Sequence, residues 1–95
     1  MEPIDSPAIS PMEYAEQNRA YTINLRRAFH ACPELAFQEY QTSEKICAEL
    51  DRLGIPFHKL RGTGVVAAIG EGKPVIGIRA DIDGLPITEK SDIPY

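Results

Sequence analysis

Two carboxylates stand two residues apart at the end of an apolar run. The run covers residues 75–80, the acids are Asp81 and Asp83, and Gly84 and Pro86 then redirect the chain. On an extended chain, side chains two positions apart point the same way, so both carboxylates can address one site. Open α/β sheets place active sites at the carboxyl ends of their strands. The pair therefore predicts a metal-organising or catalytic-base role, and the alternative is a solvated turn.

Two other motifs contain a similar pair of acids. A calcium loop would place Gly84 at its sixth position and Arg79 at its first, where an acid is required, so that motif fails. The Asp-x-Asp-Gly pattern also resembles the nucleophile motif of haloacid-dehalogenase-type phosphatases. There Asp81 would attack phosphorus and Asp83 would act as the acid/base. That family has Thr after the glycine, where this chain has Leu85, and the phosphatase is kept as an alternative.

Residues 62–67, Gly-Thr-Gly-Val-Val-Ala, match a relaxed dinucleotide-binding fingerprint. That function needs a helix directly afterwards, whose N–H groups face a pyrophosphate. The following residues are β-branched and Gly70 interrupts them, which leaves no room for a helix. The pattern instead predicts a tight turn between strands.

The histidines and cysteines do not form a ligand set in the sequence. His30 and Cys32 could be two metal ligands, but no second cluster completes four-coordination. His30 at a helix C-terminus would also interact with the helix dipole, and this structural role is favoured. Cys32 and Cys47 lack paired-motif spacing and are predicted to be free thiols in a cytoplasmic protein.

The pattern of apolar residues predicts helix, helix, strand, strand, strand. The first helix starts at Pro11, capped by Ser10, and runs to about His30. The second runs from about Tyr40 to Leu53, with Gly54 as its stop. The strands are expected at residues 55–60, 64–69 and 75–80, after a mobile tail at residues 1–9. Strands that are apolar on both faces belong to a sheet that is covered on both sides. Two helices can shield only part of such a sheet.

Composition narrows the class of protein. The chain has 95 residues, 43% of them hydrophobic and 25% charged, with a net charge of −4. This is ordinary globular composition, and the negative charge argues against nucleic-acid or anionic-membrane partners. No apolar stretch approaches the roughly 20 residues that span a bilayer, and the N-terminus lacks the features of a secretory signal.

Three segments read in order carry a resemblance to a known family. They are Arg-Arg-Ala-Phe-His-Ala-Cys-Pro-Glu at residues 26–34, Thr-Gly-Val-Val-Ala at 63–67 and Arg-Ala-Asp-Ile-Asp-Gly-Leu-Pro at 79–86. Together they resemble the start of metal-dependent amidohydrolases of the aminoacylase/carboxypeptidase-like group. That group includes hippurate hydrolases, indole-acetyl–amino acid hydrolases and N-acyl-diaminopimelate deacetylases. The likeness runs from about Leu25 to Glu89.

The resemblance implies a two-domain α/β enzyme with a mixed sheet in its catalytic domain. It implies two zinc or manganese ions, a metal-bound water, a glutamate base and N-acyl amino acid substrates. Asp81 and Asp83 match the family's strand-end carboxylates, for which we expect a supporting role in orienting ligands. The family usually has Ala where this chain has Gly84. Its Cys-Gly-His metal motif, catalytic glutamate and other histidine ligands have no match here, so no metal is expected to bind this chain alone.

The chain is therefore expected to be the N-terminal part of an amidohydrolase's catalytic domain, with residues 10–95 inactive in isolation. A second hypothesis is a non-catalytic α/β interaction module. If the chain is such a part, the missing strands and helices leave apolar sheet surface uncovered, which predicts self-association or a homo-oligomer.

Overall fold

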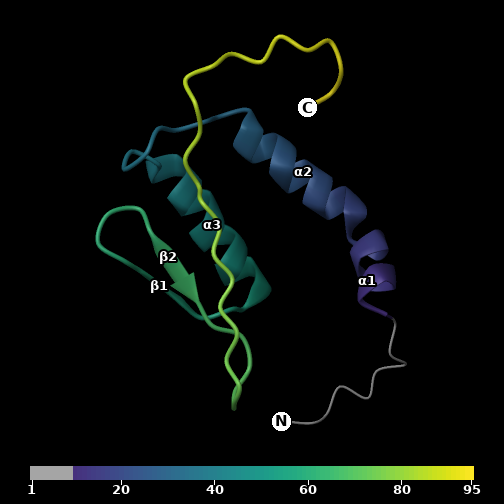
Figure 1. The fold of residues 1–95 in the computed structure, drawn as a ribbon, viewed down its shortest axis with the longest axis vertical. Coiled ribbons are helices and arrows are strands. Elements are labelled where there is room, and N and C mark those ends of the chain that lie inside the picture. Colours follow the sequence, from purple (N-terminus) through teal and green to yellow (C-terminus); the bar gives the residue numbers. More distant parts are fainter. Residues whose placement is uncertain (1–9) are drawn as a thin grey trace.

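A computed structural model describes residues 10–95, and the predicted tail at residues 1–9 lies outside this range. Three helices precede a small hairpin and a long extended segment (Figure 1). The elements are α1 (Pro11–Gln17), α2 (Arg19–His30), α3 (Tyr40–Leu53), β1 (Phe57–Lys59) and β2 (Val65–Ala67). Helices with a strand hairpin agree with the predicted α/β class.

The first predicted helix is divided in two, which corrects the prediction of one helix from Pro11 to His30. Asn18 leaves helical geometry with φ −101° and ψ 13° and separates α1 from α2. Its side-chain amide donates to the Tyr14 carbonyl at 2.9 Å. An asparagine side chain that bonds nearby backbone competes with the helix. The predicted start is confirmed, because Ser10 Oγ accepts from the Glu13 N–H at 3.1 Å.

Helix α3 has the predicted bounds. Gly54 ends it with φ 71°, a left-handed conformation that glycine adopts without a Cβ penalty. Among the apolar residues of α3, Cys47 is buried, Ile46 and Leu50 are half-buried, and Leu53 is exposed. Cys32 and Cys47 are free, as predicted.

A polar cluster joins α2 to α3. The Tyr21 hydroxyl donates to the Glu49 carboxylate, which also accepts from Arg52 Nε at 3.0 Å, and the Arg52 guanidinium lies 5.3 Å from the Tyr21 ring centroid. The hydrogen bond from Arg52, followed by that from Tyr21, lowers the pKa of Glu49. Glu49 therefore links the two helices.

Strands β1 and β2 form an antiparallel hairpin in which Phe57 pairs with Ala67 and Lys59 with Val65. The Leu60 N–H donates to the Gly64 carbonyl at 2.9 Å, which closes the turn. Gly62 adopts φ 89° within it. The tight turn predicted at residues 62–64 is therefore confirmed, and it leads into a strand where a dinucleotide site would need a helix.

The third predicted strand does not form within the described residues. Residues 75–80 belong to no helix or strand, and all are exposed. Val75, Ile76 and Ile78 are 84%, 83% and 95% exposed. A strand needs a neighbour for its backbone N–H and C=O groups, and the two-stranded sheet ends at β2. The described sheet is accordingly antiparallel, where a mixed sheet was predicted.

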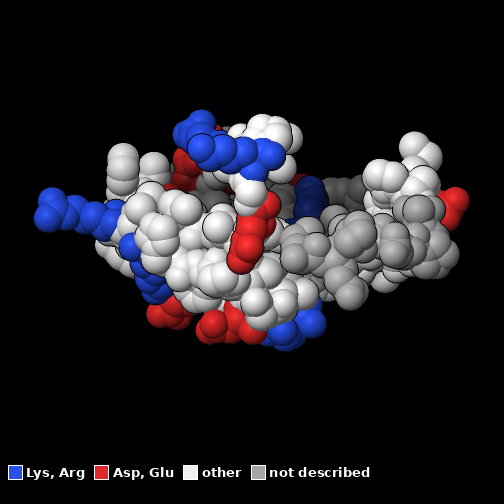
Figure 2. Space-filling view, turned by 90° about the horizontal axis from the view of Figure 1, so that it is seen from below, with Lys and Arg blue, Asp and Glu red and all other residues white. Residues whose placement is uncertain are grey.

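The molecule is open and has little core. Its radius of gyration is 16.1 Å, against about 13 Å for a compact chain of about 100 residues. Cys47 is the one hydrophobic residue that counts as buried among residues 10–95. Figure 2 shows charges of both signs in separate small groups with uncharged surface between them. The helices of residues 10–95 are too short and too polar to traverse a bilayer.

Candidate functional site

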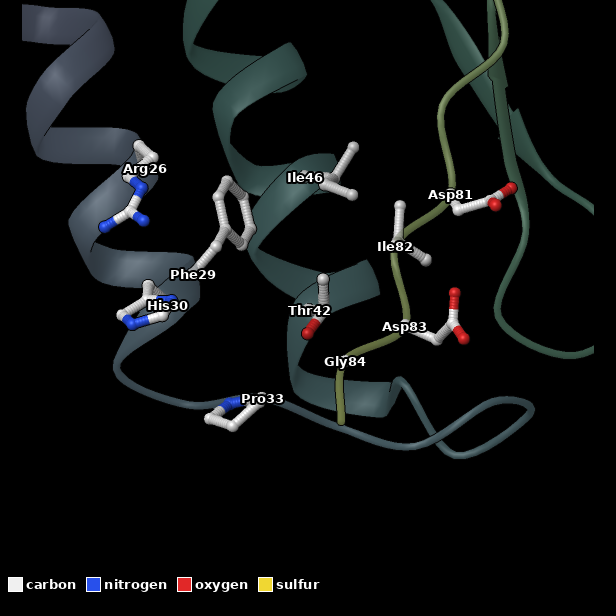
Figure 3. Close-up of a pocket in the computed structure, with 10 residues that line it drawn as sticks. All are labelled: Arg26, Phe29, His30, Pro33, Thr42, Ile46, Asp81, Ile82, Asp83 and Gly84. Atoms are coloured by element: carbon white, nitrogen blue, oxygen red, sulfur yellow. The ribbon is translucent and has the colours of Figure 1, made fainter. Parts of the chain in front are cut away.

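A cleft of about 460 Å³ lies where α2, α3 and the extended segment meet (Figure 3). Helix α2 contributes side chains from its last two turns, and α3 contributes two from its first half. The segment Asp81–Gly84 closes the remaining side. The lining residues are Arg26, Phe29, His30, Pro33, Thr42, Ile46, Asp81, Ile82, Asp83 and Gly84. The cleft thus unites two of the segments that carry the family resemblance.

Gly84 attaches the acid-bearing segment to the connector between α2 and α3. Its N–H donates to the Glu34 carbonyl at 2.6 Å. A Cβ at position 84 would lie 2.7 Å from Pro33 Cβ and 3.3 Å from Pro33 Cα. Real carbon atoms pack at about 3.5–4.0 Å, so the close approach depends on the absence of a side chain at Gly84.

The Glu34 side chain caps the N-terminus of α3. Its carboxylate accepts from the Gln41 N–H at 3.1 Å, the Thr42 N–H at 2.6 Å and the Thr42 hydroxyl at 2.7 Å. These N–H groups have no partner within the helix itself. The hydrogen bond from the Thr42 hydroxyl is the largest cause of a lowered pKa at Glu34. Sequence reasoning missed this role, because the glutamate precedes the helix by six residues instead of occupying its cap position.

Asp81 and Asp83 lie on the same side of the segment and point away from α2 and α3 (Figure 3). Both are exposed, whereas Ile82 between them is half-buried. Asp81 Oδ1 lies 2.7 Å from Arg79 Nη2. The i, i+2 spacing thus produces the shared orientation expected of an extended chain. The two carboxylates are presented to groups that approach from the side opposite the helices.

His30 ends α2, as predicted, and its imidazole lies at the other end of the cleft. Its Nε2 is 3.0 Å from Glu89 Oε1, and the His30 and Tyr95 rings meet edge to face with centroids 5.2 Å apart. The hydrogen bond with His30 is the largest cause of a lowered pKa at Glu89. The long-range partner Glu89 carried no sequence signal of its own.

The described residues do not provide a metal-binding set. Within residues 10–95, no three His, Cys, Asp or Glu side chains lie close enough together to hold a metal ion. The histidine of the His30–Cys32 pair binds Glu89, and the Cys32 thiol lies 3.6 Å from Gln41 Oε1. The paired metal ions implied by the resemblance therefore do not fit the donor groups that this part of the chain supplies.

Comparison with known proteins gives three informative relatives. The chain is 46% identical over 86 residues to IAA-amino acid hydrolase ILR1-like 6 of Arabidopsis thaliana. This match covers 88% of this chain and 18% of that protein. It is 48% identical over 80 residues to N-acetylcysteine deacetylase of Bacillus subtilis, covering 77% of this chain and 20% of the relative. It is 42% identical over 76 residues to the putative amidohydrolase YhaA of the same bacterium. This match covers 77% of this chain and 19% of the relative.

These identities confirm the resemblance, and the chain belongs to this family of amidohydrolases. It spans about a fifth of the length of the curated relatives it matches. Neither the phosphatase nor the non-catalytic module gains support from these names. No protein-family model matches the chain, and no solved structure matches it.

Proposed function

We propose that this chain carries the N-terminal helices and the acid-bearing segment of a metal-dependent amidohydrolase that cleaves N-acyl amino acids. The observation that carries the proposal is homology to proteins whose names describe hydrolysis of IAA-amino acids and deacetylation of N-acetylcysteine. The matched length is a fifth of those relatives, which supports reading these residues as part of a larger catalytic domain. The released products would be a carboxylate and an amino acid.

Asp81 and Asp83 are proposed to support the reaction by accepting hydrogen bonds from groups that bind metal or substrate. Their exposure and shared direction away from the helices suit contact with groups outside residues 10–95. Carboxylates in this position fix the orientation and raise the basicity of a metal-binding imidazole. The two zinc or manganese ions would take their ligands from outside this chain, so hydrolysis is not expected from the chain alone.

The exposed apolar row at residues 75–80 supports a second part of the proposal. Its side chains and unpaired extended backbone form an edge that another strand can join. We propose that further strands cover this edge in the larger enzyme. In the isolated chain, we propose that a second copy of the chain covers it. A cytoplasmic location is proposed from the two free thiols.

The test begins with the natural gene product. A mass about five times the 10.5 kDa of this chain agrees with the proposal, and a product of 10.5 kDa contradicts it. The larger product is then assayed on N-acyl amino acids with added Zn²⁺ or Mn²⁺, as the native protein and as Asp83→Asn. The substitution is expected to lower metal affinity or activity by roughly 10- to 100-fold, the effect of removing a supporting hydrogen-bond partner.

The matched control is Asp51→Asn, which removes an exposed carboxylate on α3, away from the cleft. It should leave metal affinity and activity unchanged. Equal activity of the Asp83→Asn variant and the native enzyme would remove Asp83 from the site, while absence of amidohydrolysis in the native enzyme would overturn the function itself.

A further inference from the structure

Glu34 contacts two separate walls of the cleft at once. Its side-chain carboxylate accepts hydrogen bonds at the start of α3, from the Gln41 N–H at 3.1 Å and from the Thr42 N–H and hydroxyl at 2.6 Å and 2.7 Å. Its backbone carbonyl accepts from the Gly84 N–H at 2.6 Å. Thr42 and Gly84 both line the cleft, one from α3 and one from the extended segment (Figure 3). A single residue therefore joins α3 to the segment that carries the acids.

The connector that contains Glu34 is not held by apolar packing. Leu35 and Phe37 follow in it and are 45% and 88% exposed. Phe37 has φ 67°, a left-handed backbone conformation that is unfavourable for a bulky residue and persists only where the surrounding structure imposes it. The Gln38 N–H donates to the Leu35 carbonyl at 2.9 Å and closes the turn. The turn leads the chain back towards Glu34, so the polar contacts of Glu34 hold the connector against α3.

The position of Asp83 depends on this connector through the next residue. The Asp83 side chain is exposed and points away from the helices, so packing does not fix it. The adjacent Gly84 lies so close to the connector that a Cβ there would be 2.7 Å from Pro33 Cβ. A movement of the connector would therefore move Gly84, and Asp83 with it.

We propose that Glu34 is a positioning residue that fixes the Asp83 carboxylate relative to α3. Its side chain attaches the connector to the helix, and its backbone carbonyl attaches residue 84, one position after Asp83, to the connector. Hydrogen bonds to a carboxylate are stronger than those between neutral groups, which suits a contact that holds a loop without packing. The part that Glu34 plays in catalysis rests on the proposed function, whereas its link between the two segments belongs to the fold.

Amide hydrogen exchange of the 95-residue chain, followed by NMR, tests the link. Thr42→Val keeps the shape of the side chain, removes the hydroxyl that donates to Glu34 and leaves residue 84 unaltered. The Gly84 amide should then exchange roughly two- to ten-fold faster, the factor for the net contribution of one hydrogen bond. The Cys47 amide, in the middle of α3, reports on opening of the whole helix and should accelerate less. Thr42→Ser restores the hydroxyl and should return exchange at Gly84 to the native rate.

Glu34→Gln is the second variant, because an amide oxygen replaces only one of the two carboxylate oxygens that accept at α3. It should accelerate exchange at Gly84 at least as much as Thr42→Val does. Glu44→Gln is the matched control, since it removes an exposed carboxylate from the same helix and should leave exchange at Gly84 unchanged. Native exchange at Gly84 in either test variant, an equal acceleration at Cys47, failure of Thr42→Ser to restore the native rate, or acceleration in Glu44→Gln would overturn the proposal.

A double-mutant cycle in the natural gene product tests whether Glu34 acts through Asp83. Thr42→Val should lower kcat for an N-acyl amino acid by roughly two- to ten-fold in the native background. It should cause no further loss in the Asp83→Asn background, and an equal loss in both backgrounds would overturn the positioning role. A native gene product without amidohydrolysis would overturn the proposed function, whereas the exchange rates at Gly84 decide the link without any catalytic readout.

Discussion

Replacement of Gly84 by Ala tests the contact that attaches the acid-bearing segment. The new Cβ would meet Pro33 Cβ at 2.7 Å, and relief to about 3.5 Å requires a movement of roughly 0.8 Å. Pro33 is a ring that cannot rotate out of the way, so the segment must move. The same movement would stretch the Gly84–Glu34 hydrogen bond from 2.6 Å towards the limit of a useful bond.

The magnitude follows from two opposing effects. Overpacking of this kind costs about 1–3 kcal/mol, whereas the alanine restricts the unfolded chain and returns about 0.4–1 kcal/mol. The net loss is about 1–2 kcal/mol of attachment free energy, a factor of roughly 5–30 in the population of the detached state. Hydrogen exchange of the amide at position 84, followed by NMR, measures that factor directly.

Gly77→Ala provides the matched control. Gly77 lies in the same extended segment, has no positive φ, and a Cβ there meets nothing within 4 Å. This variant should leave exchange at position 84 unchanged. If Gly84→Ala exchanged no faster than the native chain, the close approach to Pro33 would be refuted, and the alanine that the family usually carries here would fit this chain without adjustment.

Two further predictions concern the Glu34 cap and the apolar row. Glu34→Gln should reduce the helical circular dichroism signal of the 95-residue chain at neutral pH. Because the pKa of Glu34 is lowered, the helical signal of the native chain should be constant above the ordinary glutamate pKa. It should fall as acid protonates the carboxylate. A Gln variant with the same pH profile as the native chain would contradict the capping role. Ile76→Lys with Ile78→Lys should reduce self-association in sedimentation velocity, because both side chains are more than four-fifths exposed in the uncovered row. Met12→Lys, at an equally exposed position on α1, should leave it unchanged, and a monomeric native chain would refute association through this row.

Features with a local cause could be predicted from the sequence. Ser10 and Gly54 set the start of α1 and the end of α3 through the conformations of single residues and their neighbours. The turn at Gly62 could be predicted because the apolar run that comes after it in the sequence is too short for a helix. The break at Asn18 was not predicted, because the apolar period of the helix continues across it. The break arises from the Asn18 side chain, which bonds nearby backbone and so competes with the helix.

The site shows the same division. The sequence determined the family, the pair Asp81 and Asp83, and their shared direction, because alternation along an extended chain needs no tertiary information. Tertiary structure alone decided that Glu34 caps α3, that Gly84 meets Pro33, and that His30 pairs with Glu89, since each contact joins residues whose chain separation carries no periodic signal. It also decided that residues 75–80 form no strand among the described residues, because a strand exists only where a neighbour supplies its hydrogen bonds.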